Sequence, residues 1–248
     1  MMEIGVGEDG KKLLKRIPHE GGEIVFEYKV YKGSYGEVAE AIDKIGLIRP
    51  SSSEIVSLIY DACINSNGQC GSNILDLMER NWIWGYTGSL YLPKGEGDIQ
   101  DGVIFQDNPL IVNRKLVMNK KDLIEKLNDR EEFRVKGYPI FISKDKSIRF
   151  VPFGYKTGVQ SVKELEENPH IIGRYFGRKD NELEGASKVA VLASRYTKNP
   201  VLYSFRGVNE EISVISGIDK TLDEFGLIIG CNAGSSFNNG YGFGKLAD

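Results

Sequence analysis

The alternation of apolar and polar positions near the start of the chain predicts one strand followed by three helices. Residues 23–32 alternate with a period of two, which is typical of a half-buried strand. Apolar residues then recur at helical spacing over 34–46, 51–62 and 72–80. The first two segments begin with Ser-x-x-Glu, a capping box in which each side chain satisfies the backbone N–H of the other residue. We therefore expect an N-terminal helical segment.

Short runs of strand-forming residues, separated by turns, dominate the rest of the chain. They cover 82–93, 101–106, 116–118, 138–142, 147–153, 201–205, 212–218 and 225–231. Three helices are predicted between them. The first covers 120–130, the second begins with a capping box at Ser161 and Glu164 and ends at Pro169, and the third begins with a capping box at Asn181 and Glu184. The Asn239–Gly240 pair predicts a C-terminal hairpin, because this dipeptide favours the turn that joins two antiparallel strands.

This order of elements predicts an α+β fold. An N-terminal helical segment is followed by a mixed, largely antiparallel sheet with two or three further helices and a C-terminal hairpin. Two domain organisations remain open. In the first, residues 1–110 form a helical segment plus an aromatic hairpin, in the element order of a winged helix, and residues 111–248 form an α+β domain. In the second, the chain is one continuous domain.

Composition places the chain among ordinary folded proteins of a reducing compartment. Of its 248 residues, 41% are hydrophobic and 27% are charged, which excludes wholesale disorder. No segment approaches the roughly 18 consecutive apolar residues that a membrane helix requires, and the N-terminus lacks the apolar core of a signal peptide. Three cysteines and two histidines form neither a disulfide framework nor a zinc spacing. We expect a cytoplasmic protein with no cofactor, no metal and no membrane partner.

The charge of the chain is concentrated in an acidic segment followed by a basic one. Residues 34–110 carry 4 basic and 11 acidic groups, a net charge of −7, whereas residues 111–149 carry 11 basic and 6 acidic groups, a net charge of +5. An acidic helical region repels DNA phosphates, so sequence-specific DNA binding is not expected. The basic segment, represented by Arg114, Lys115, Lys120 and Lys121, is a candidate patch for RNA or for the acidic segment of a second copy.

Three aromatic residues, Trp82, Trp84 and Tyr86, alternate along a predicted strand and therefore project from one of its faces. Such a row stacks on sugars or bases when it is exposed. More often it forms part of a core or of a protein interface. The row is a candidate binding surface, with the core as its alternative.

The segment 149–161 is the candidate anion site. A predicted strand leads into a loop containing Gly154, Lys156, Thr157 and Gly158, and the loop ends where a helix begins at Ser161. Glycines let backbone N–H groups converge, and the lysine and the helix N-terminus both favour negative charge. The spacing is not that of a phosphate-binding P-loop. An ordinary capped connection is the alternative.

Four stretches of this sequence, SYGEVAEAI, WIWGYTGSLYLP, IFQDNP and RFVPFGYKTG, resemble an uncharacterised archaeal protein family from about residue 34 onward. The resemblance implies an archaeal cytoplasmic protein and lends no activity or site.

Three functions remain open, and the sequence assigns no catalytic set. The first is a non-catalytic binding or interaction protein that uses its charged and aromatic surfaces, with a protein partner or self-association. The second is a protein or enzyme that binds a phosphate-bearing small molecule at 154–161. The third is an RNA- or ribosome-associated factor that uses 111–149.

Overall fold

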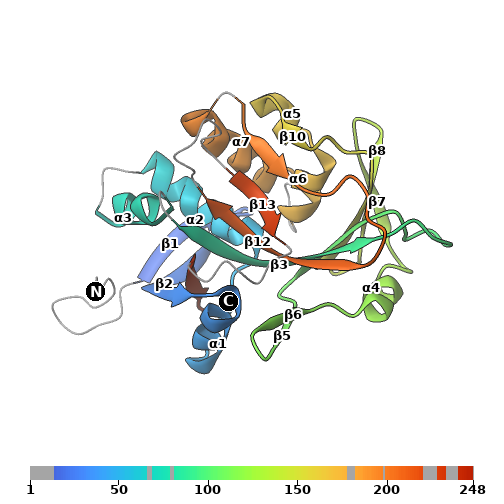
Figure 1. The fold of residues 1–248 in the computed structure, drawn as a ribbon. Helices are drawn as coiled ribbons and strands as arrows, with labels where there is room; N and C mark the ends of the chain where they lie inside the picture. The colour runs from blue at the N-terminus through green and yellow to red at the C-terminus, as the bar shows by residue number, and fades with distance from the viewer. Residues whose placement is uncertain are drawn as a thin grey trace.

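A computed structural model describes residues 14–65, 69–78, 81–177, 182–197, 199–219, 228–232 and 240–247. Within these residues, twelve strands form one curled sheet with the order β10-β11-β13-β12-β3-β4-β9-β8-β7, and β1, β2 and β14 join it beside β3 (Figure 1). Most neighbours are antiparallel, whereas β11–β13 and β14–β3 are parallel. The strands of the large sheet are β1 (Leu14–His19), β2 (Gly22–Gly33), β3 (Trp82–Leu92), β4 (Gly102–Asp107), β7 (Glu131–Val135), β8 (Tyr138–Ile142), β9 (Ile148–Pro152), β10 (Gly158–Val159), β11 (Val201–Tyr203), β12 (Ile212–Asp219), β13 (Ile228–Asn232) and β14 (Gly240–Lys245).

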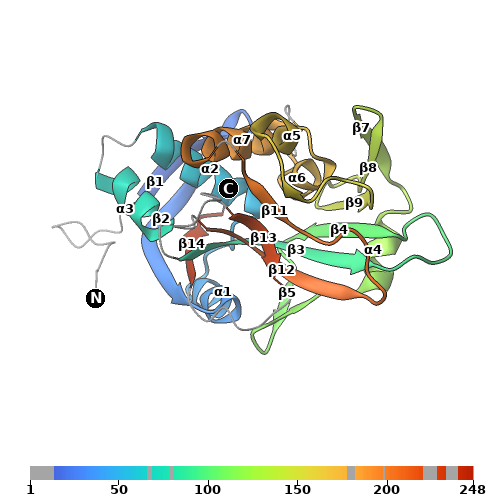
Figure 2. The same ribbon diagram turned by 45° about the horizontal axis from the view of Figure 1, so that its top comes forward.

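The helices cover both faces of this sheet. Figure 2 shows α2, α5, α6 and α7 together above the sheet, with α1 below it. A separate two-stranded hairpin, β5 (Leu110–Val112) and β6 (Lys115–Val117), also lies below β3 in Figure 1, beside α4. The helices are α1 (Tyr35–Lys44), α2 (Ser52–Ile64), α3 (Gln69–Met78), α4 (Lys120–Lys126), α5 (Val162–Glu166), α6 (Pro169–Arg174) and α7 (Glu184–Tyr196). No helix of the described ranges is long and apolar enough to cross a membrane.

Strand β3 is buried on both faces and separates the two layers. Ile83 and Tyr91 point into the main core with α2, α6 and α7, whereas Trp84 and Tyr86 point into a second core with α1. Leu90, on the same face as the two aromatic residues, packs with α4 in a third cluster. This alternation is the period-two geometry of a strand.

The local helix signals in the sequence are largely confirmed. Capping boxes begin α1 at Ser34, α2 at Ser51 and α5 at Ser161, with both reciprocal hydrogen bonds present in each. The predicted start of α7 is wrong: Leu183 occupies its cap position and makes no side-chain bond. Asn181 lies outside the described residues, and the carboxylate of Glu184 instead contacts Lys188 and the backbone of Glu20.

Other expectations about the elements need correction. A separate N-terminal helical segment is not confirmed, because the β1–β2 hairpin precedes the helices and β2 belongs to the large sheet. Pro169 follows α5 as expected, but it is also the first residue of α6, where its missing N–H costs no hydrogen bond. The predicted hairpin at Asn239–Gly240 lies in part outside the described residues; β14, which begins at Gly240, pairs with β2 and β3. The division at residue 110 stays a prediction; strands from both sides of it lie in one sheet.

Candidate functional site

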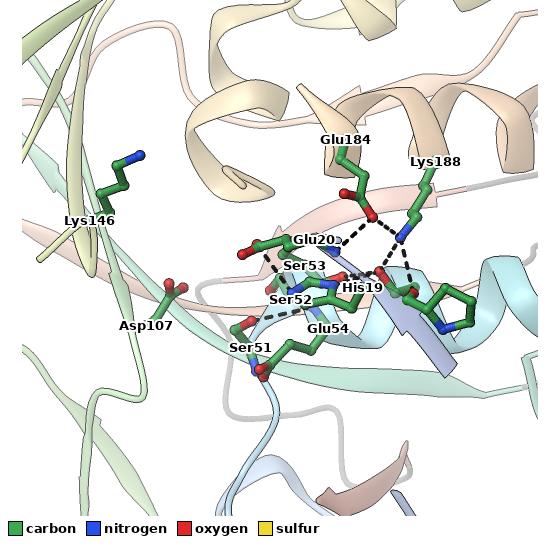
Figure 3. Close-up of polar contacts among 12 residues, drawn as sticks. His19, Glu20, Ser51, Ser52, Ser53, Glu54, Asp107, Lys146, Glu184 and Lys188 are labelled. Atoms are coloured by element: carbon green, nitrogen blue, oxygen red, sulfur yellow. Dashed lines mark hydrogen bonds and ion pairs between the residues drawn. The ribbon is translucent and has the colours of Figure 1, made fainter. Parts of the chain in front are cut away.

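A cleft of about 560 Å³ opens between the β1–β2 turn, the start of α2 and the end of β14. Its lining is rich in polar groups that come from distant parts of the sequence (Figure 3). The polar lining residues are His19, Glu20, Glu23, Ser51, Ser53, Glu54, Asp107 and Lys245. The volume lies within the range of about 300–1,000 Å³ that is usual for small-molecule sites.

The β1–β2 turn forms the first wall of the cleft. His19 pairs with Gly22 across the hairpin, so the loop consists of Glu20 and Gly21, both in the left-handed region with φ of 48° and 73°. This is the two-residue turn that matches the twist of antiparallel strands. Glu20 is an uncommon residue at such a position. Its carboxylate lies 3.2 Å from Nε2 of His19, and its backbone N–H donates to Oε1 of Glu184 at 3.2 Å.

A chain of side chains fixes this wall from behind. Nδ1 of His19 lies 2.9 Å from the hydroxyl of Ser57, which also accepts a hydrogen bond from Nζ of Lys188 at 2.8 Å. A carboxylate, an imidazole and a hydroxyl thus follow one another, the order found in catalytic triads. However, Ser57 is only 1% exposed, and its hydroxyl donates to the carbonyl of Ser53 within α2. The chain therefore positions Glu20 at the cleft and does not present Ser57 as a nucleophile.

The first turn of α2 forms the second wall. Glu54 uses both carboxylate oxygens: Oε2 accepts from the backbone N–H of Ser51 at 2.7 Å, and Oε1 lies 2.6 Å from Nζ of Lys245. The capping box of α2 is thereby joined to β14. Because two partners hold the carboxylate of Glu54, this wall is ordered before any ligand arrives.

A buried ion pair supports the floor of the cleft at Asp107. Arg149 donates from both terminal nitrogens to the two carboxylate oxygens of Asp107, at 2.6 and 3.0 Å. The two side chains are only 1% and 4% exposed. Asp107 also accepts from the hydroxyl of Thr87 at 2.7 Å, and Thr87 in turn accepts from the backbone N–H of Ser52 at 2.9 Å. One hydrogen-bond network therefore connects β9, β4, β3 and the start of α2.

Within the described residues, no group of three or more histidine, cysteine, aspartate or glutamate side chains has the arrangement of a metal site. The cleft instead offers carboxylate acceptors, an ammonium donor and hydroxyls, which suits a polar ligand that carries both donors and acceptors.

A second polar cluster lies in the main core around His170. Nε2 of His170 is 2.8 Å from the hydroxyl of Ser204 and 3.0 Å from that of Tyr91. Burial, with a smaller contribution from Arg174, lowers the pKa of His170 well below its ordinary value, and burial raises the pKa of Tyr91. A neutral imidazole with so low a pKa is a weak general base. The cluster therefore ties β3, α6 and the segment after β11 together.

The predicted aromatic surface is part of the core. Trp82, Trp84 and Tyr86 share one face of β3 as expected, but Trp84 and Tyr86 are only 2% and 0% exposed. Tyr35 of α1 covers them, with ring centroids 5.8 Å from Trp84 and 4.7 Å from Tyr86. The hypothesis that this row is a binding surface is therefore wrong for Trp84 and Tyr86, because α1 packs onto that face.

The candidate anion loop uses its charged and hydroxyl groups internally. Gly154 and Gly158 adopt positive φ. Nζ of Lys156 lies 2.9 Å from Glu164, the residue that also caps α5 through Ser161, and Thr157 accepts a hydrogen bond from Arg206. The helix that follows has only five residues. Anion binding at Gly154, Lys156, Thr157, Gly158 and Ser161 stays a prediction.

Two of the four basic residues of 111–121 pair with acidic residues of the same chain. Arg114 contacts Glu37 at 2.9 Å and Glu40 at 3.0 Å, and Lys120 contacts Glu211 at 2.7 Å. Lys115 and Lys121 are exposed. The basic segment therefore meets the acidic segment within one molecule, and RNA binding stays a prediction.

The sequence did not reveal the cleft. Its lining comes from residues 19–25, 51–54, 107, 176 and 245–247, which no spacing rule connects. Two local signals were present: the Glu20–Gly21–Gly22 run, which favours a tight turn, and the capping box of Ser51 and Glu54.

No protein-family model matches this chain, and no curated protein matches it. A solved structure is similar to it with a TM-score of 0.52 and 14% sequence identity, over 88% of this chain and 96% of the other. That structure is described as "Accommodation of massive sequence variation in Nanoarchaeota by the C-type lectin fold". At this identity the likeness concerns the fold alone. The chain is thus similar in fold to a nanoarchaeal protein with the C-type lectin fold.

Proposed function

We propose that the protein is a non-catalytic binding protein that holds a polar ligand in the cleft between the β1–β2 turn, α2 and β14. The observation that carries the proposal is the cleft itself, whose volume of about 560 Å³ suits a ligand of metabolite size. Its carboxylates are held in place by partners, Glu54 by Lys245 and Asp107 by Arg149. A ligand therefore meets groups that are already ordered, which lowers the entropic cost of binding.

The fold likeness supports a binding role. The nanoarchaeal structure is described as a fold that accommodates massive sequence variation. A scaffold of that kind keeps its fold through its interior and changes its function through its surface. In the present chain large apolar clusters hold the sheet, while the polar groups of the cleft lie in a turn and near the ends of strands and of α2.

The cleft can be tested by filling it. Ser53→Leu places a larger apolar side chain in the lining, and Ser194→Leu adds the same group to the exposed surface of α7, outside the lining. The purified proteins are denatured and the released small molecules are identified by mass spectrometry. Native samples of the same three proteins are also tested by thermal shift against sugars, amino acids, dipeptides and nucleosides. We expect wild type and Ser194→Leu to bind the same compound, and Ser53→Leu to bind it at least tenfold more weakly.

A second variant separates charge from shape. Glu20→Gln keeps the size of the side chain and removes its charge, and Glu96→Gln makes the same change on an exposed loop. We expect only Glu20→Gln to weaken binding, because Glu20 lines the cleft. If Ser53→Leu binds as tightly as wild type, if no compound binds, or if the bound compound is converted to a product, the proposal fails.

A further inference from the structure

The β5–β6 hairpin projects from the large sheet and has two different faces. Its register places Leu110 opposite Val117, Ile111 opposite Leu116, and Val112 opposite Lys115. Residues opposite one another share a face, and alternate residues along a strand lie on opposite faces. Leu110, Val112, Lys115 and Val117 therefore form one face, which we call the outer face. Ile111 and Leu116 form the inner face.

The inner face anchors the hairpin to β3. Ile111 packs against the core cluster that contains Trp84 and Tyr86. Leu116 and Met118 approach Gly88 so closely that a Cβ there would lie 3.1 and 2.9 Å from their side chains. A residue larger than glycine at position 88 would force these side chains to shift.

The tip of the hairpin is fixed to α1. Asn113 and Arg114 both have positive φ, of 48° and 64°, although arginine in the left-handed region costs about 1–2 kcal/mol. Two contacts offset this cost. Arg114 pairs with Glu37 and Glu40, and Gly36 lets the backbone of Arg114 approach so closely that a Cβ on Gly36 would lie 2.2 Å from its carbonyl oxygen. The hairpin is thus held at its tip and along its inner face.

The outer face is apolar and exposed, and it carries one lysine. Leu110, Val112 and Val117 are 58%, 43% and 40% exposed, and they are not part of the cleft lining. Residues 110–121 include four basic and no acidic residues. Arg114 and Lys120 pair with glutamates of the chain, and Lys115 lies exposed on the outer face itself. Contiguous exposed apolar surface with polar residues at its rim is typical of a protein-interaction site.

We propose that the outer face of the β5–β6 hairpin docks an extended segment of a partner protein in which every second side chain faces the hairpin, and in which these facing side chains are apolar with one acidic residue among them. The apolar side chains would cover Leu110, Val112 and Val117, and an acidic side chain would meet Lys115. Because the hairpin is anchored at its tip and its inner face, little conformational entropy is lost on binding. This interaction lies outside the cleft and does not depend on the ligand proposed there.

Two synthetic peptides of equal length test the chemistry of the partner. One carries valine, valine and glutamate in turn at every second position with serine between them, and the other has lysine in place of glutamate; each is flanked by Gly-Ser residues and carries a fluorophore. Binding to the full chain is measured by fluorescence anisotropy. We expect the acidic peptide to bind at least tenfold more tightly than the basic one, and Lys115→Glu to reverse this order. Equal binding of both peptides, or no binding of the acidic one, overturns the proposal.

Matched valine variants locate the site. Val112→Asp removes an apolar side chain of the outer face, whereas Val191→Asp makes the same change on α7 at nearly the same exposure, 43% against 44%. We expect the first to weaken binding of the acidic peptide at least tenfold and the second to leave it unchanged, with both proteins retaining the circular dichroism spectrum of wild type. Equal loss in both variants overturns the proposal. Two further results also overturn it: tighter binding of an oligouridine RNA than of the acidic peptide, or concentration-dependent self-association that Val112→Asp abolishes.

Discussion

Removal of the Arg149 side chain should destabilise the whole fold, because it leaves a buried carboxylate without its counter-charge. Arg149 is 1% exposed and donates to both oxygens of Asp107, to the carbonyl of Gly173 at 2.9 Å and to that of Arg174 at 3.3 Å. In Arg149→Met, Asp107 keeps the hydroxyl of Thr87 as a donor, but it loses the guanidinium.

The expected loss follows from the burial of the pair. Removing one member of a buried ion pair costs about 3–5 kcal/mol. A domain of this size loses about 2–4 °C in melting temperature per kcal/mol, so the midpoint of Arg149→Met should fall by about 6–20 °C. Urea unfolding followed by circular dichroism gives the free energy, and differential scanning calorimetry gives the midpoint.

Two companion variants separate the charge from other effects. Arg134→Met removes an arginine whose side chain is 61% exposed and pairs with Glu132, and it should change stability by less than about 1 kcal/mol. The double variant Asp107→Leu with Arg149→Met removes both charges and should regain part of the loss. A loss in Arg149→Met no larger than that of Arg134→Met would refute the reasoning.

Three further predictions concern other parts of the molecule. Gly36→Ala places a methyl group against the backbone of Arg114 and should lower the free energy of unfolding by about 1–3 kcal/mol, with faster hydrogen exchange in 110–117. The control Gly207→Ala meets no atom within 4 Å and should change stability by less than about 0.5 kcal/mol, so equal effects of the two variants would contradict the close approach. Because burial lowers the pKa of His170, below pH about 6.5 the unfolded chain binds a proton that the folded chain does not bind. The free energy of unfolding therefore keeps this contribution above pH about 6.5 and loses up to about 1.4 kcal/mol per pH unit below it. Urea unfolding between pH 5 and 7.5 should show that stability depends less steeply on pH in His170→Gln than in wild type. Hydrogen bonds from the backbone of Ser161 and, to a smaller extent, from Lys156 lower the pKa of Glu164 to about 2. An NMR titration should therefore find a higher pKa of Glu164 in Lys156→Ala, and an unchanged pKa would show that Lys156 does not contribute to the shift.

Local signals in the sequence located the helices well but not their arrangement. The capping boxes at Ser34, Ser51 and Ser161 were readable because their hydrogen bonds span only three residues. The aromatic row of β3 was placed correctly on one face, whereas its burial depends on where α1 packs. Burial by a distant element is a tertiary property, and no periodicity in the strand itself encodes it.

The cleft escaped prediction for the same reason. Its walls meet only because β14 pairs with β2 and because the β1–β2 hairpin contacts α7 through the hydrogen bond from the Glu20 N–H to Glu184. The charge pattern was also easier to detect than to interpret. The acidic and basic segments were evident, but Arg114 with Glu37 and Arg149 with Asp107 show that much of this charge is paired within the molecule.

The position of β14 has a consequence for how the chain folds. This strand pairs antiparallel with β2 and parallel with β3, so it fills the place between two strands made about 160 to 220 residues earlier. During synthesis, the β1–β2 hairpin and β3 emerge from the ribosome long before their common neighbour. The edges of β2 and β3 that β14 covers are therefore exposed in the nascent chain, and the sheet closes only after residues 240–245 have left the exit tunnel.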